Sequence, residues 1–134
     1  MKLKNFIIVL ALILTVTGCG STKNNNNDIK TDNSKLTCTS TDEAAKSTYV
    51  FNFDDNDDLK SIDITLEFTK DEYAQTIYSI FSAKEEYNAK IEGTKVTYNE
   101  SVETFKNGYD LEKASKDKVK EAFEQSDEES FVCK

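Results

Sequence analysis

A run of acidic and amide side chains at residues 54–58, with the sequence DDNDD, is the segment of this 134-residue chain whose spacing comes nearest to a metal site. Its oxygen ligands at alternate positions, Asp54, Asn56 and Asp58, match the start of a calcium-binding loop. The rest of that pattern fails, because the sixth position is Leu59 where the loop needs glycine and the twelfth is Thr65 where it needs glutamate. The segment therefore predicts a solvated turn, with weak calcium binding as the alternative.

The composition offers little for catalysis. The chain has no histidine, which is the side chain most often used for proton transfer near neutral pH. A serine, threonine or cysteine nucleophile would have only carboxylates or lysines available as its base. The four glycines, at positions 18, 20, 93 and 108, form no phosphate-binding loop. Among 25 acidic residues, paired carboxylates arise by chance, so we predict that the protein is not an enzyme and uses no cofactor.

The first 18 residues predict a signal for export. Residues 1–5 carry two lysines, and residues 6–16 are apolar apart from Thr15. This run is shorter than the roughly 20 apolar residues that a membrane-spanning helix needs. A basic start, a short apolar stretch and small residues before a cleavage point are typical of secretory signal peptides. We therefore expect residues 1–18 to be a signal peptide that is removed.

The end of this segment, Val16-Thr17-Gly18-Cys19, resembles the lipobox of bacterial lipoproteins. The resemblance implies that Cys19 becomes the new N-terminus and carries a diacylglyceryl group on its sulfur. Two acyl chains hold a protein stably on a membrane, whereas one chain gives only marginal attachment. The implied location is the outer face of the cell membrane, and the frequent use of Lys, Asn and Ile suggests a low-GC Gram-positive bacterium or a relative. An ordinary secretory signal with an incidental cysteine is the alternative.

Assigning Cys19 to lipid leaves one pair of cysteines, Cys38 and Cys133, which lie 95 positions apart. In an exported protein such a pair can be oxidised. A bridge that closes a loop of this length would stabilise the fold by roughly 4.7 kcal/mol in the chain-entropy model. We predict this disulfide, and the alternatives are two free thiols or a metal pair that lacks further cysteine or histidine ligands.

Beyond the signal peptide the chain divides into a tether and one domain. Residues 19–35 form a lipidated N-terminus and an Asn-rich segment that cannot bury apolar surface, so we expect a disordered tether. As a flexible coil, residues 20–35 would span about 20–24 Å. Residues 36–134 are sufficient for a single extracytoplasmic domain with one modest core. Because the chain from Cys19 onward carries 15 lysines against 25 carboxylates, a net charge of −10, nucleic acid is not an expected partner.

Alternation of apolar and polar residues predicts the strands of this domain. The clearest case is Ile62, Ile64, Leu66 and Phe68, whose intervening residues are polar. The acidic turn at 54–58 would join this strand to the preceding one as a hairpin. The predicted strands are residues 35–41, 47–53, 62–68, 90–105 with a bend at Gly93, and 130–133, the last of which would return Cys133 to the first strand.

Two helices are predicted between these strands. Thr69 and Glu72 match a capping box that would start a long helix ending near Asn88. Its apolar stripe contains Tyr73, Ile77, Ile80, Phe81 and the stem of Lys84, extended by Tyr87. After a turn at Asn107-Gly108, Ser115 would cap a shorter helix to about Gln125, buried through Val119, Ala122 and Phe123. The predicted fold class is α+β, an antiparallel sheet of four to five strands with one long and one shorter helix packed on one face.

Tyrosines are the remaining candidates for contact with a ligand or partner, because aromatic side chains anchor binding surfaces. Of Tyr73, Tyr78, Tyr87, Tyr98 and Tyr109, we expect Tyr73 and Tyr87 to serve the core, because they fall on the helix stripe. Tyr78 lies beside that stripe and Tyr109 falls in a predicted loop. These two are therefore the better candidates for exposed contact residues.

The order of lipobox, polar tether and a hairpin followed by a helix over Tyr49–Tyr87 resembles the small bacterial lipoproteins of unknown function typified by YehR. The resemblance implies location and fold order, and it supplies no activity and no site. We expect a non-catalytic, lipid-anchored surface domain that binds an unknown protein or small ligand, or supports the envelope. The alternatives are an accessory or regulatory subunit of a membrane transport or secretion complex and, third, an inhibitor or immunity protein held outside the membrane.

Overall fold

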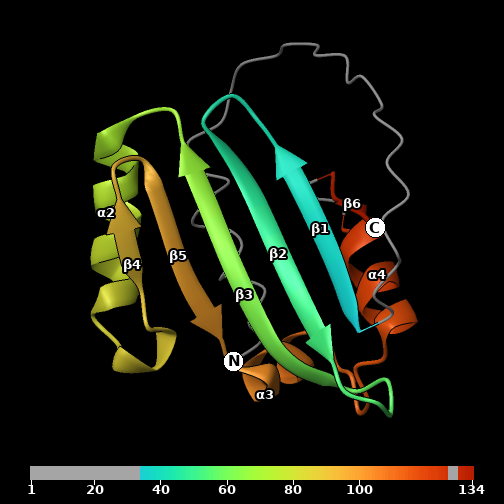
Figure 1. Cartoon of the computed structure of the whole chain (residues 1–134). Helices are drawn as coiled ribbons and strands as arrows, with labels where there is room; N and C mark the ends of the chain where they lie inside the picture. Colours follow the sequence, from blue (N-terminus) through green and yellow to red (C-terminus); the bar gives the residue numbers. More distant parts are fainter. Residues whose placement is uncertain (1–33, 127–129) are drawn as a thin grey trace.

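The computed structural model describes residues 34–126 and 130–134. The predicted signal peptide, Cys19 and the tether up to residue 33 lie outside the described residues. The described chain forms one six-stranded antiparallel sheet with the order β4-β5-β3-β2-β1-β6 (Figure 1). The strands are β1 Lys35–Thr41, β2 Ala45–Phe53, β3 Leu59–Phe68, β4 Lys90–Glu92, β5 Lys95–Glu100 and β6 Val132–Cys133.

The described helices lie on one face of this sheet (Figure 1). Helix α2 packs over β3, β4 and β5, whereas α4 packs over β1 and β6, and α3 contacts β3. The helices are α2 Asp71–Ser82, the short 3-10 helix η2 Glu85–Tyr87, α3 Val102–Gly108 and α4 Lys116–Glu124. The predicted α+β class, with helices on one face of an antiparallel sheet, is confirmed. The described residues form six strands and three α-helices, which is more than the predicted four to five strands and two helices. None of the helices seen in the described residues has the length and apolar character required to cross a membrane.

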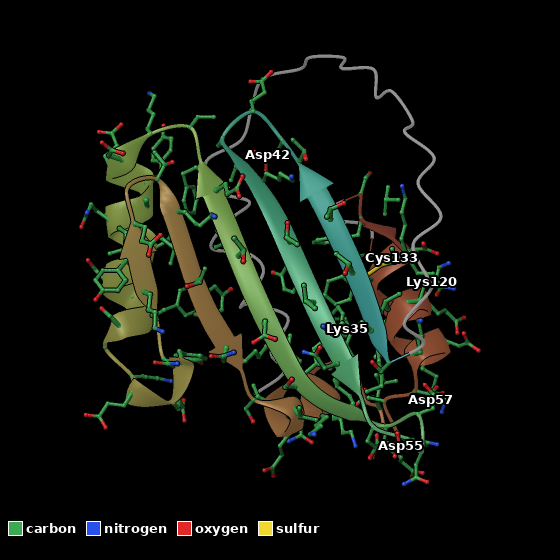
Figure 2. All side chains as sticks on the ribbon, viewed as in Figure 1. Lys35, Asp42, Asp55, Asp57, Lys120 and Cys133 are labelled. Atoms are coloured by element: carbon green, nitrogen blue, oxygen red, sulfur yellow. A yellow bond between two sulfur atoms is a disulfide. The ribbon has the colours of Figure 1, made fainter. Side chains whose placement is uncertain are left out.

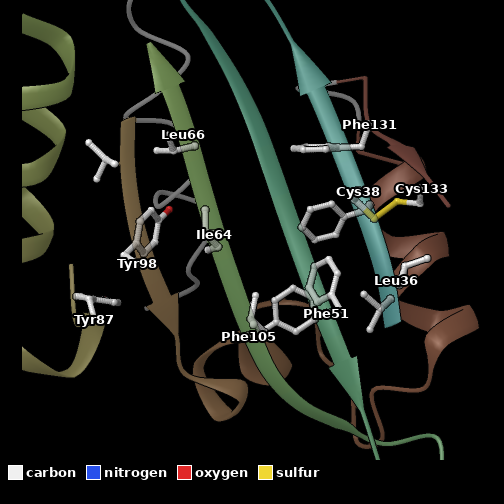
Figure 3. Close-up of a cluster of buried hydrophobic side chains, with 14 of the residues drawn as sticks. Leu36, Cys38, Phe51, Ile64, Leu66, Tyr87, Tyr98, Phe105, Phe131 and Cys133 are labelled. Atoms are coloured by element: carbon white, nitrogen blue, oxygen red, sulfur yellow. A yellow bond between two sulfur atoms is a disulfide. The ribbon is translucent and has the colours of Figure 1, made fainter. Parts of the chain in front are cut away.

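Strand register brings the apolar residues onto the helix-covered face. Phe51 of β2 lies between Leu36 of β1 and Ile62 of β3, and Ile64 lies opposite Tyr98 of β5. Phe51 is fully buried and its ring contacts those of Phe105 and Phe123, which come from α3 and α4 (Figure 3). The core therefore joins the sheet to both C-terminal helices through one aromatic cluster.

The opposite face of the sheet is polar. Four threonines stand directly opposite one another across four strands, in the order Thr39, Thr48, Thr65 and Thr97. Threonine combines the β-branching that favours strands with a hydroxyl that tolerates water, so it suits the solvated face of a sheet. In the next row, the Asp63 carboxylate accepts hydrogen bonds from the side-chain amides of Asn52 and Asn99 at 3.0 and 2.6 Å.

The predicted strand over 90–105 is only partly correct. It turns at Gly93, whose φ of 58° suits glycine, and so forms the β4–β5 hairpin. The prediction that Val102 and Phe105 continue the strand is wrong, because both lie in α3. Ser101 stops the strand by capping this helix, its hydroxyl accepting a hydrogen bond from the Thr104 amide at 3.4 Å. The predicted turn at Asn107-Gly108 is likewise the last part of α3.

The predicted long helix is shorter than expected and starts differently. Helix α2 ends at Ser82, and Tyr87 reaches the core from η2, after which Asn88 takes a left-handed conformation with φ of 45°. The capping box is wrong, since the cap residue is Lys70 and the Thr69 hydroxyl donates to the Ala44 carbonyl at 3.2 Å. Thr69 thus ties the start of the helix to the β1–β2 turn. Ile80, assigned to the buried stripe, is 47% exposed because Ala74, Ile77 and Phe81 fill the contact with the sheet.

Candidate functional site

The first predicted site is a disulfide, and the structure forms it. Cys38 and Cys133 are directly opposite each other on β1 and β6, with a sulfur–sulfur bond of 2.02 Å (Figure 3). Both side chains belong to the buried core. Backbone hydrogen bonds of 2.9 Å in both directions between Thr37 and Lys134 continue the pairing. The bridge therefore holds the last short strand of the domain against the first strand.

In the second candidate, the acidic turn, several carboxylate oxygens bond to other groups of the protein. Asp54 Oδ1 accepts hydrogen bonds from the backbone amides of Asn56 and Asp58 at 2.9 and 3.0 Å. Asp58 Oδ1 lies 3.1 Å from Lys106 Nζ, and the hydrogen bond from that lysine lowers the pKa of the Asp58 carboxyl. Within the described residues no three acidic, histidine or cysteine side chains are placed to share a metal ion. Weak calcium binding by Asp54, Asn56 and Asp58 stays a prediction.

Instead, the turn docks onto the segment between α3 and α4. The Asn56 carbonyl accepts a hydrogen bond from Lys113 Nζ at 2.9 Å, and Asp57 Oδ1 accepts one from the backbone amide of Lys116 at 3.1 Å. The backbone amide of Lys116 belongs to the first turn of α4, whose amides have no partner within the helix. The Ser115 side chain does not cap this helix. Figure 2 labels Asp55 and Asp57 of the turn near the start of α4. Asp57 therefore replaces the predicted Ser115 cap from a distant part of the sequence.

This contact predicts a matched pair of variants. Asp57→Ala should lower the free energy of unfolding by about 1–2 kcal/mol, because it removes a helix cap and because alanine tolerates the φ of 57° poorly. Asp57→Asn should stay within about 0.5 kcal/mol of the parent, since asparagine can accept the same bond and adopt the same φ. Urea unfolding curves measure both differences. Equal destabilisation by the two variants would show that the Asp57 carboxylate charge, and not the cap, matters.

The tyrosine candidates are more buried than expected. Tyr109, predicted to be exposed in a loop, is half-buried with its ring 4.7 Å from that of Phe105, because α3 draws it onto the core. Tyr78 also packs against the core as a partly buried side chain. Tyr87 is buried, as predicted, and contacts Phe81 and Tyr98. The tyrosines thus contribute to packing, and they do not form an exposed row.

Sequence patterns gave no signal for Glu100, which has the most perturbed carboxyl among the described residues. It lies on the core face at the end of β5, directly opposite Ile62, and is only partly exposed. Burial raises the pKa of Glu100 to about 7. Burial also raises the pKa of Tyr98 well above its usual value, with Tyr49 and Glu100 adding to the effect. Because β5 continues up to Glu100 before the Ser101 cap starts α3, this acid is the last strand residue on the core face.

Glu100 predicts a pH dependence of stability. Its folded pKa exceeds the ordinary value of 4.5, so the folded protein binds the proton more tightly than the unfolded chain does. The resulting stabilisation is complete below pH 4.5 and is lost as the pH rises through about 7. Glu100→Gln should therefore be more stable than the parent at pH 8, by on the order of 1 kcal/mol after allowance for partial exposure, and equal to it at pH 4.

Unfolding by urea at pH 4, 6 and 8 measures this effect, with the exposed Glu92→Gln as the control for loss of one charge. If Glu100→Gln and Glu92→Gln follow the same pH profile, the Glu100 carboxyl is not desolvated in the folded protein.

Comparison with known proteins assigns no family to this chain. No protein-family model, curated protein or solved structure matches the chain. The lipobox and YehR-like resemblances therefore stay predictions. What the structure contributes is a closed disulfide at one edge of the sheet, an acidic turn used for docking, and a half-buried acid beside the aromatic core.

Proposed function

We propose that this protein is a non-catalytic binding domain held at the outer face of the cell membrane by lipid on Cys19. The observation that supports it best is the Cys38–Cys133 disulfide, because such bonds persist in exported proteins and are rare in the reducing cytosol. Lys35, the last residue of the predicted tether 19–35, is the first residue of β1, and the Ser34 carbonyl accepts a hydrogen bond from the Phe53 amide at 2.7 Å. The predicted tether therefore ends before Ser34, and its residues 19–33 lie outside the described residues.

The binding role is supported by the fold as well as by the composition. A disulfide-closed sheet with helices on one face is a rigid support for surface contacts. Its charged side chains are exposed on strands, helices and loops alike, for example Lys60 and Glu67 on β3 and Lys120 on α4. Lysine side chains are the main amines of the domain, so a lysine-reactive reagent that cannot cross the membrane shows on which side of the membrane the domain lies.

The test labels intact cells with a membrane-impermeant, lysine-reactive cross-linker and then isolates the tagged full chain. The proposal expects labelled protein without cell lysis, with Cys38 and Cys133 resistant to alkylation until a reductant is added. Labelling that appears only after lysis would overturn the location, and a cross-linked permease or secretion component in equal amount would favour the accessory-subunit alternative over an autonomous binder. An untagged cytosolic marker that stays unlabelled confirms intact cells.

A further inference from the structure

A shallow groove of about 760 Å³ runs along α3 and the segment that follows it. Its apolar part comes from Val102 and Leu111, which are half-buried against the core. Three exposed carboxylates, those of Glu103, Asp110 and Glu112, line the same groove. The groove therefore presents an apolar floor beside a row of negative charge.

The lysines of this region neutralise these carboxylates only in part. Lys106, which also lines the groove, lies 3.1 Å from Asp58 and so has its charge balanced by the β2–β3 turn. Lys113, next to Glu112, donates to the Asn56 carbonyl at 2.9 Å. Among the described residues, the ion pairs involve none of the three groove carboxylates. With Lys106 balanced by Asp58 and Lys113 counted against the neighbouring Glu112, the described groove keeps the net negative charge of two carboxylates.

This arrangement suits an extended cationic ligand better than a single ion. The three carboxylates are not close enough to share a metal, since the described residues contain no such group of three. A peptide can instead place positive side chains at intervals along the groove and set an apolar side chain on the floor. Surface ion pairs alone contribute little to the free energy of binding. An apolar side chain that is buried against Val102 and Leu111 adds a hydrophobic contribution to it.

We propose that this groove binds a basic segment of a partner protein, with lysine or arginine side chains at Glu103, Asp110 and Glu112 and an apolar side chain on Val102 and Leu111. The inference deepens the binding role proposed above and rests on it. It names the partner by chemistry, as a short polypeptide in which basic and apolar residues alternate. Association should weaken as salt is added, as expected for exposed charge pairs.

The probe is the peptide acetyl-Lys-Leu-Lys-Leu-Lys-amide, titrated by calorimetry into the full chain in uncharged detergent micelles. Glu103→Gln/Asp110→Asn/Glu112→Gln should weaken binding at least tenfold, and asparagine keeps the φ of 54° found at Asp110. The matched control, Asp71→Asn/Glu85→Gln/Glu92→Gln, removes the same charge from α2, η2 and β4 and should change affinity less than twofold. Circular dichroism establishes that both variants are folded.

A second probe tests the floor. Acetyl-Lys-Ser-Lys-Ser-Lys-amide should bind at least fivefold more weakly than the leucine peptide. Equal loss in the groove variant and its control, or equal affinity of the two peptides, would overturn the proposal, as would no binding at millimolar peptide. Because the lysine-labelling experiment on cells does not depend on this titration, a failed groove and a wrong location give different results.

Discussion

Removal of the disulfide by Cys38→Ala/Cys133→Ala is expected to lower the free energy of unfolding by about 4 kcal/mol. The bond closes a loop of 95 positions, so its loss greatly increases the conformational freedom of the unfolded chain. It also frees β6, which has only two residues and is otherwise held by the paired backbone bonds of Thr37 and Lys134. Domains of this size are usually stable by about 5–15 kcal/mol, so this loss would remove between about a quarter and four-fifths of the free energy of unfolding.

Urea unfolding of the double variant, and of the parent with and without reductant, measures this change. The reduced parent and the double variant should unfold at similar urea concentrations, well below the oxidised parent. Val132→Ala, which alters the exposed neighbour of Cys133 and leaves the bridge intact, is the control and should cost less than 1 kcal/mol. A loss below 1 kcal/mol in the double variant would mean that the bridge does not restrict the unfolded chain.

Replacement of Cys19, the first cysteine of the chain, is expected to have a large effect on the location of the protein. Cys19→Ala should abolish incorporation of a fatty-acid analogue and move the protein out of the washed membrane fraction by more than tenfold. The physical reason is that two acyl chains give stable attachment, and without them the acidic chain is repelled by anionic lipid.

The Cys38→Ala/Cys133→Ala variant is the matched control, because it loses two cysteines and should keep the lipid label on Cys19. Metabolic labelling followed by gel fluorography compares the two. A Cys19→Ala protein that still takes up label would refute lipidation at this position, and a label lost in the control would place lipid elsewhere.

Local patterns in the sequence were sufficient for most strands. Alternation in Ile62, Ile64, Leu66 and Phe68 identified β3, and the threonine-rich segment 35–41 matches β1. These predictions are confirmed because a sheet with one covered face requires period-two burial, which is visible in any single strand. The pairing of Cys38 with Cys133 followed from counting cysteines once Cys19 was assigned to lipid, and that assignment remains a prediction.

Helix ends and side-chain partners were less predictable. The Val102 and Phe105 pattern fits a strand, yet the Ser101 cap starts α3 there. The Thr69 and Glu72 pattern fits a capping box, yet Thr69 bonds to the β1–β2 turn. In both places two local signals compete, and contacts with residues far along the chain decide between them.

The amino-acid sequence by itself determined the α+β class, most of the strands and the cysteine pair, because burial periodicity and cysteine count are properties of short segments and composition. Only the tertiary structure decided what the charged residues do. It placed Asp57 on the first amide of α4, Lys106 beside Asp58, and Glu100 against the core. Among the ion pairs of the described residues, it left Glu103, Asp110 and Glu112 out, since the charge balance of a surface depends on which distant segments fold next to it.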